Sequence, residues 1–151
     1  MKTLFTDASF DYKHTERTTE PFVRGKIAVA DSKGFARIEK VVIGKVPNLK
    51  QYINILELTA IARAVELAGE ENPKADSLSV NTDSQVAMCW ANAGKIKPKV
   101  LTQAHTNALE YLRTARIQFG GIVSFHFVPR DENPAGKLLE EELEREAPHT
   151  I

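Results

Sequence analysis

The sequence is poor in the features that mark disulfide-rich, secreted or membrane-spanning proteins. Its one cysteine, Cys89, excludes an internal disulfide framework and any zinc site built from several cysteines. The segment from Met1 to Phe10 lacks the apolar run of a signal peptide, and no stretch reaches the roughly 18 apolar residues that a membrane span needs. We therefore expect a soluble, cytoplasmic protein with no membrane partner, and we expect Cys89 to lie in the core.

An excess of charge of either sign is also absent. The 20 lysines and arginines balance 20 aspartates and glutamates, so the formal net charge is zero at pH 7 with histidine neutral. Proteins that hold nucleic acid tightly and without sequence preference usually carry a basic excess. A nuclease is compatible with this balance, provided that its cations are clustered or its contacts are few.

The overall composition is that of one globular domain. Hydrophobic residues make up 42% and charged residues 26% of the 151-residue chain, close to the average for folded proteins. No repeat, low-complexity tract or long linker divides the sequence. We expect a single domain over residues 1–151.

The first third of the chain predicts three antiparallel strands. Two apolar segments, Phe22–Ala30 and Phe35–Val46, flank the turn Asp31–Gly34, which is the pattern of a β-hairpin. The segment Thr3–Ala8 is expected to form another strand. The polar segment Ser9–Glu20 is expected to be a long turn or connection.

Helices and strands alternate in the rest of the chain. Apolar residues recur at helical spacing, and glycine or proline ends several of the segments. The expected elements are helices at Leu49–Leu67, Asp83–Ala93, Val100–Gln118 and Pro134–Glu146, and strands at Ser77–Thr82 and Ile122–Val128. Strands separated by helices usually pair in parallel. The sequence thus predicts an α/β fold with one five-stranded mixed sheet, three antiparallel strands followed by two parallel ones, flanked by helices on both faces.

Three acidic residues occupy positions where apolar residues would be expected. Asp7 ends an apolar strand, Asp83 stands where a strand meets a helix, and Glu57 borders an apolar helical stripe. Functional sites in α/β sheets gather at the carboxyl ends of strands, so the three side chains can converge. Each also has a simpler explanation: a strand-end turn for Asp7, a water-facing head for Glu57 and a helix N-cap for Asp83.

Convergence of three carboxylates would call for a divalent cation. Like charges at close range raise one another's pKa, and a cation removes that conflict. Ligand sets made only of oxygen favour Mg²⁺ or Mn²⁺. Carboxylates that share two metal ions are an arrangement used for phosphoryl transfer.

The stretches around these acids resemble the first three acidic motifs of the type 1 ribonuclease H family. They are Leu4–Asp7 (LFTD), Asn54–Ala60 (NILELTA) and Asn81–Gln85 (NTDSQ), of which the tetrapeptide Thr-Asp-Ser-Gln is the most specific. The order of the predicted elements matches as well, so the resemblance covers nearly the whole chain. It implies the ribonuclease H-like fold.

The resemblance also implies a metal-dependent endonuclease that hydrolyses the RNA strand of RNA–DNA hybrids. By this resemblance, the catalytic, metal-binding carboxylates would be Asp7, Glu57 and Asp83, and Asp7 would bridge two metal ions. One ion would activate a water and the other would stabilise the leaving 3′ oxygen. Asn54 and Gln85 match positions where the family contacts nucleic acid from the minor-groove side, and amides can both donate to and accept from 2′-hydroxyls.

The fourth acidic motif departs from the pattern of the family. The segment Val128–Asn133 (VPRDEN) is present, but the position that is usually an aspartate falls on Gly136 or Lys137, depending on the alignment. Glu140 lies one helical turn after Gly136. It can act as the substitute metal ligand, because helical side chains lean toward the N-terminus.

Other outcomes stay open for this position. Lys137 would place an ammonium where one ion would otherwise sit, and Asp131 or Asn133 would act from the preceding turn. A further alternative is a weak or inactive site, which would leave a domain that binds nucleic acid or a protein partner. A related nuclease that acts on another nucleic acid is the last alternative, since a fold does not determine its substrate.

Overall fold

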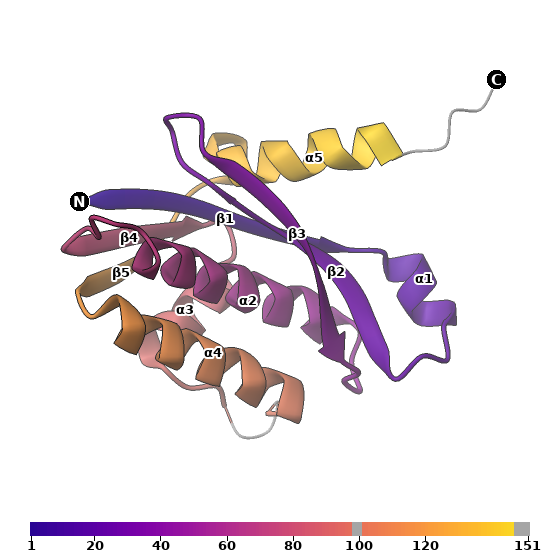
Figure 1. The fold of residues 1–151 in the computed structure, drawn as a ribbon. Helices are drawn as coiled ribbons and strands as arrows, with labels where there is room; N and C mark the ends of the chain where they lie inside the picture. Colours follow the sequence, from indigo (N-terminus) through magenta and orange to yellow (C-terminus); the bar gives the residue numbers. More distant parts are fainter. Residues whose placement is uncertain (98–100, 147–151) are drawn as a thin grey trace.

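The computed structural model describes residues 1–97 and 101–146 and contains one five-stranded sheet. The strands are β1 (Lys2–Phe10), β2 (Phe22–Ala30), β3 (Ala36–Gly44), β4 (Ser77–Thr82) and β5 (Ile122–Phe127). Their order across the sheet is β3-β2-β1-β4-β5 (Figure 1). The pairs β1–β2 and β2–β3 are antiparallel, whereas β1–β4 and β4–β5 are parallel. This confirms the predicted mixed sheet.

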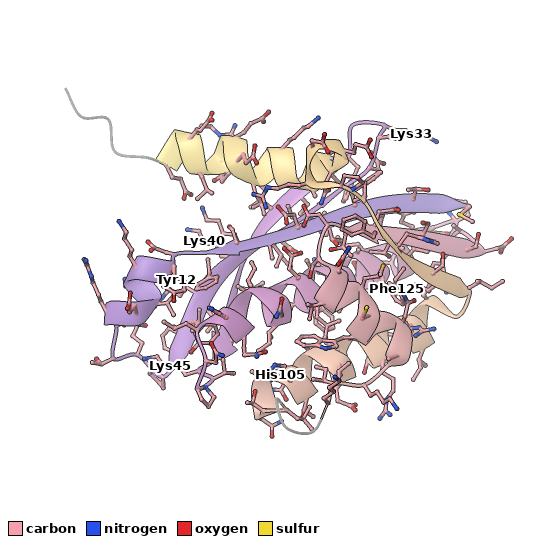
Figure 2. The ribbon with its side chains drawn as sticks, turned by 180° about the vertical axis from the view of Figure 1, so that it is seen from behind. Tyr12, Lys33, Lys40, Lys45, His105 and Phe125 are labelled. Atoms are coloured by element: carbon pink, nitrogen blue, oxygen red, sulfur yellow. The ribbon has the colours of Figure 1, made fainter. Side chains whose placement is uncertain are left out.

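Helices cover both faces of the sheet, as the sequence predicts. Figure 1 shows α2 (Lys50–Gly69), α3 (Gln85–Ala93) and α4 (Gln103–Phe119) on one side, with α5 (Pro134–Glu146) on the other; Figure 2 gives the view from behind. The helix α2 is buried over much of its circumference because it packs against β1 and β2 on one side and against α4 on the other. Among the described helices, none combines the length and apolar character needed to span a lipid bilayer.

Alternation along the central strand β1 decides which side chains face which helix. Successive side chains of a strand point to opposite faces. Leu4 and Ala8 accordingly pack in the clusters formed with α2, while Phe5 packs with Ala135 and Leu139 of α5. Asp7 has the same parity as Phe5, so the sheet presents this carboxylate on the α5 face.

One helix was not predicted. The expected connection Ser9–Glu20 contains α1 (Tyr12–Arg17), and β1 runs on to Phe10. Asp11 caps this helix by accepting a hydrogen bond from the amide of His14 at 2.9 Å, and the buried Thr15 hydroxyl donates to the Asp11 carbonyl at 2.7 Å. The sequence pattern did not indicate this helix, because local capping hydrogen bonds rather than an apolar stripe define it.

The prediction that Cys89 lies in the core is wrong. Cys89 is exposed, because α3 contacts the core through Ala87 and Ala91, which lie on another side of the helix. The start of α3 also differs from the prediction, since the helix begins at Gln85 rather than at Asp83.

Candidate metal centre

Three carboxylates from three elements meet where β4 ends beside β1. One carboxylate oxygen from each of Asp7, Glu57 and Asp83 lies within 4.8 Å of the others. We refer to these three residues as the acidic cluster. Parallel pairing of β1 with β4 explains why Asp7 and Asp83 are neighbours. Thr6 of β1 is in register with Thr82 of β4, and an aspartate follows each of these threonines. Glu57 reaches the same point from α2, which packs on β1.

The acidic cluster contains carboxylate oxygens that lack hydrogen-bond partners. Asp7 is 3% exposed and Glu57 is 4% exposed, and no described residue donates a hydrogen bond to Asp7 Oδ1 or Glu57 Oε2. A buried charged oxygen without a partner costs free energy. A hard divalent cation that prefers oxygen ligands would remove this cost, so the donor set fits Mg²⁺ or Mn²⁺.

The electrostatics of the cluster point the same way. Burial raises the pKa of the Glu57 carboxyl well above its usual range, and the neighbouring carboxylates Asp7 and Asp83 raise it further. Burial also raises the pKa of Asp7, and the charge of Asp83 adds to the effect. Both shifts disfavour the ionised carboxylates, and a bound cation would offset them.

Asp83 is not the N-cap of α3. The cap is Ser84, whose Oγ accepts a hydrogen bond from the amide of Ala87 at 3.1 Å, while Thr82 Oγ1 accepts from the amide of Ser84 at 3.0 Å. The carboxylate of Asp83 is thus not engaged by its own helix. It accepts a hydrogen bond from Nδ2 of Asn133 at 3.3 Å instead.

The position of the usual fourth acid is Gly136. A Cβ atom built on Gly136 would lie 3.3 Å from Oδ2 of Asp7 and 3.8 Å from Oδ2 of Asp83, so this residue borders the acidic cluster without adding a side chain. Lys137 is exposed, and its ammonium forms no ion pair with Asp7 or Asp83. The structure therefore selects Gly136 over Lys137 as the residue that faces the cluster.

The structure does not bring Glu140 to the acidic cluster. Its carboxylate is more than half exposed, and Oε1 lies 3.6 Å from Nη2 of Arg130. Asp131 is exposed as well, on the short 3₁₀ helix η2 (Arg130–Glu132). Among the alternatives for the fourth position, only Asn133 contacts a cluster residue with its side chain.

The two amides predicted to contact nucleic acid flank the cluster along the chain. Asn54 is half-buried on α2, three residues before Glu57, which is the spacing of neighbours on one helical face. Gln85 is exposed at the first position of α3, two residues after Asp83. Both elements therefore present an amide close to a carboxylate of the cluster.

Comparison with known proteins shows the fold. No protein-family model matches the chain, and no curated protein matches it significantly. Ribonuclease H1 from the halophilic archaeon Halobacterium salinarum is similar in structure, with a TM-score of 0.60 and 16% identity over 95% of this chain and 97% of that one. LC11-ribonuclease H1, which was isolated from compost and solved in complex with an RNA/DNA hybrid, has a TM-score of 0.58 and 18% identity over 91% of each chain.

A third structure supports the same conclusion. The N-terminal ribonuclease H domain of rv2228c from Mycobacterium tuberculosis has a TM-score of 0.56 and 15% identity, covering 91% of this chain and 95% of that one. The strand order and the helices on the two faces agree with these structures. The chain has the fold of the type 1 ribonucleases H.

Proposed function

We propose that the chain is a metal-dependent endonuclease that hydrolyses the RNA strand of RNA–DNA hybrids. The observation that carries the proposal is the acidic cluster, in which buried carboxylates from three elements approach within 4.8 Å and leave oxygens without partners. Asp7, Glu57 and Asp83 would hold Mg²⁺ or Mn²⁺. Bound in a pair, such ions supply an activated water and stabilise the leaving oxygen of a phosphodiester.

The residues of the chain contribute position and enclosure. Asp7 lies opposite Ala28 of β2, one residue past the point where the register of β1 with β4 ends, and its Oδ2 faces Gly136 while its Oδ1 has no partner among the described residues. This supports a role for Asp7 as the carboxylate shared by two ions. Burial of Asp7 and Glu57 limits competition from water, which strengthens their hold on a cation.

An RNA–DNA hybrid is the substrate that the fold and the flanking amides favour. Asn54 and Gln85 would contact the minor groove, where an A-like duplex displays 2′-hydroxyls. The related fold of LC11-ribonuclease H1 was solved with such a hybrid, which supports the choice of substrate to test first.

A second candidate function is a domain with this fold that binds nucleic acid or a protein partner without cutting. It is favoured by the fourth position, where Gly136 supplies no ligand and Glu140 pairs with Arg130 instead. An active enzyme would therefore have to work with three carboxylates.

Cleavage of labelled nucleic acids tests both candidates. Hybrid, RNA duplex and branched DNA are each incubated with Mg²⁺ or Mn²⁺, using wild type, Asp83→Asn and the control Asp76→Asn. Asp76 is exposed and precedes β4, whereas Asp83 follows it, so the control makes the same change at the other end of the strand. We expect cleavage of the hybrid, a loss of about 100-fold or more in Asp83→Asn, and little change in Asp76→Asn, because metal ions supply several kcal/mol of transition-state stabilisation.

Absence of cleavage with either ion across pH 6–9 would reject the nuclease. Hybrid binding that persists in Asp7→Asn under those conditions would instead support the non-catalytic domain. Cleavage restricted to RNA duplex or branched DNA would keep the nuclease and replace its substrate.

A further inference from the structure

A fully buried asparagine connects the three parts of the chain that meet at the acidic cluster. Asn133 is 0% exposed. Its Nδ2 donates to the carbonyl of Thr6 in β1 at 2.9 Å and to Oδ2 of Asp83, after β4, at 3.3 Å. Its Oδ1 accepts from the amide of Ala135 in α5 at 3.1 Å. One carboxamide thus joins β1, the end of β4 and the start of α5.

We infer that Asn133 is a positioning residue that fixes the Asp83 carboxylate relative to Asp7. The inference rests on the proposed metal site. Thr6 directly precedes Asp7. One N–H of the Asn133 side chain therefore holds the backbone next to Asp7, and the other holds the carboxylate of Asp83. Among the described residues, Asn133 provides the only side-chain hydrogen bond to Asp83, and it occupies Oδ2, which leaves Oδ1 for a cation.

The local backbone makes this amide rigid. Asn133 has φ −97° and ψ 105°, the extended conformation of a helix N-cap, and Pro134 follows as the first residue of α5. Proline at that position has its φ preset and lacks the N–H that would otherwise be unsatisfied. The carboxamide is therefore held at its cap position before any ligand arrives.

A neutral donor suits this place better than the alternatives. An aspartate at position 133 would keep the cap but would add a fourth negative charge beside Asp83. A serine would also cap α5, but its single O–H could not donate to both Thr6 and Asp83. Asparagine accepts from the helix through its oxygen and has two N–H donors left for the carbonyl and the carboxylate.

Titration of Mn²⁺ into the full-length protein by calorimetry tests the inference. The variant is Asn133→Ser, which keeps a good N-cap residue and removes the donors. The matched control is Asn81→Ser, because Asn81 also donates to a β1 carbonyl, that of Leu4 at 3.2 Å, without contacting the acidic cluster. We expect the Mn²⁺ dissociation constant to rise about tenfold or more in Asn133→Ser, as for partners that orient metal ligands, and to stay within about twofold of wild type in Asn81→Ser.

The outcomes separate the inference from the function on which it rests. If wild type binds Mn²⁺ and Asn133→Ser binds it equally well, the inference is overturned and the metal site stands. If wild type does not bind Mn²⁺, the proposed metal site fails, and the inference fails with it. A merely structural role would lower the thermal midpoint without metal and leave the dissociation constant unchanged at a temperature at which the variant is folded.

A measurement on wild type covers the case in which the variant does not fold. In protein with ¹⁵N-labelled asparagine, the side-chain NH₂ signal of Asn133 should shift during a Mg²⁺ titration, with the midpoint of cation binding, while that of Asn81 should not. If the chemical shift of the Asn133 NH₂ group does not change while Mg²⁺ binds, the inference is overturned.

Discussion

Asp7 and Glu57 place carboxylates where the surrounding packing is apolar. Asp7 is in register with Ala28 of β2, which is fully buried beneath α5 together with Ala135. These alanines and Gly136 let the first turn of α5 approach the sheet closely enough to enclose the acidic cluster. The small residues therefore make room for the cluster, while the cluster destabilises the metal-free fold.

This cost predicts that Asp7→Asn stabilises the protein in the absence of metal. The pKa of Asp7 is higher in the folded state than in the unfolded state, where it is near 3.8. Below the unfolded pKa the carboxyl is protonated in both states and costs nothing. As the pH rises through the folded pKa, ionisation of Asp7 lowers the free energy of unfolding. Removing the charge should raise the melting temperature in EDTA at pH 7.5 by about 2–4 °C, which corresponds to roughly 1 kcal/mol for a chain of this length. Differential scanning calorimetry at pH 7.5 and pH 4 measures it.

The effect should shrink as the pH falls toward the unfolded pKa of Asp7, because the raised folded pKa lets the wild-type carboxyl take up its proton there. Addition of Mn²⁺ at pH 7.5 should reverse the order, since only wild type keeps its full ligand set. A lower melting temperature for Asp7→Asn in EDTA at pH 7.5 would show that the cluster is not electrostatically strained.

Sequence reasoning found the acidic cluster but not the residue that holds it. Asp7, Glu57 and Asp83 were recognisable because each interrupts an apolar pattern. Glu140 stands in an acidic run, so nothing in the sequence distinguished one member from another. Asn133 was named only as one of several alternatives for the fourth ligand. Its role as a hydrogen-bond donor was not predicted, because its partners lie 127 and 50 positions away and only the tertiary structure brings them together.

At the scale of elements, one arginine links the edge strand β3 to the helix layer. Nε and Nη2 of Arg63, on α2, donate to the two carboxylate oxygens of Glu39 at 2.7 and 3.1 Å. Nη1 donates to Glu66, which also accepts from the hydroxyl of Tyr111 on α4 at 2.6 Å. The Arg63 guanidinium holds the pKa of Glu39 below its usual range. The network therefore joins β3, α2 and α4 through one paired, partly buried cation.

Replacement of this arginine predicts a measurable loss of stability. Arg63→Met should reduce the free energy of unfolding by about 1–2 kcal/mol, because bidentate, partly shielded pairs are stronger than exposed ones, although solvent still screens them. Arg113→Met is the control, since Arg113 is 71% exposed and, among the described residues, forms an ion pair with Glu110 alone, so its loss should cost less than about 0.5 kcal/mol. Urea denaturation measures both, and equal effects would contradict the assignment.

Element boundaries and partners were harder to predict than element types. The run of glutamates in α5 has the pattern of a solvated helix face, yet Glu142 and Glu146 pair with Lys26 of β2. Lys26 is directly opposite Lys40 of β3, so the two side chains lie on the same face of the sheet; Figure 2 labels Lys40. Two cations in register on neighbouring strands repel each other, so the end of α5 supplies the carboxylates that offset them. Such complementarity depends on the docking of α5, which its own sequence does not reveal.

At the scale of the whole molecule, the acidic cluster lies where the two kinds of strand pairing meet. β1 pairs antiparallel with β2 and parallel with β4, and α2 and α5 contact it from opposite faces. A cation held by Asp7, Glu57 and Asp83 would therefore join β1, α2 and the end of β4, which are separated along the first half of the chain. Its binding free energy would be added to the stability of the fold.

Divalent cations should accordingly raise the melting temperature of the entire protein. At a Mn²⁺ concentration 100 times the dissociation constant, linkage predicts about 2.7 kcal/mol of stabilisation, or about 5–11 °C for a chain of this size. The increase should be mostly lost in Asp83→Asn. Differential scanning fluorimetry across a Mn²⁺ series measures it, and equal increases in both proteins would place binding elsewhere.

The topology was the most predictable level. Hairpin signals around Asp31–Gly34 and alternating helices and strands after Pro47 restrict the sheet to few arrangements, because connections are short and crossovers have one hand. The structure confirms that arrangement, and proteins with 15–18% identity share it. Exposure of single side chains, such as Cys89, escaped prediction because it depends on how each helix is rotated in its contact with the core.

The central place of β1 has a consequence for synthesis on the ribosome. Within this chain β1 is translated before its hairpin neighbours β2 and β3, which follow at once, so that three of the five strands can pair early. Its parallel partner β4 emerges only after α2, and the α5 cap comes after β5. A nascent chain consequently exposes Asp7 long before Asp83 is synthesised, and Asn133 can join the acidic cluster only after β5 has emerged.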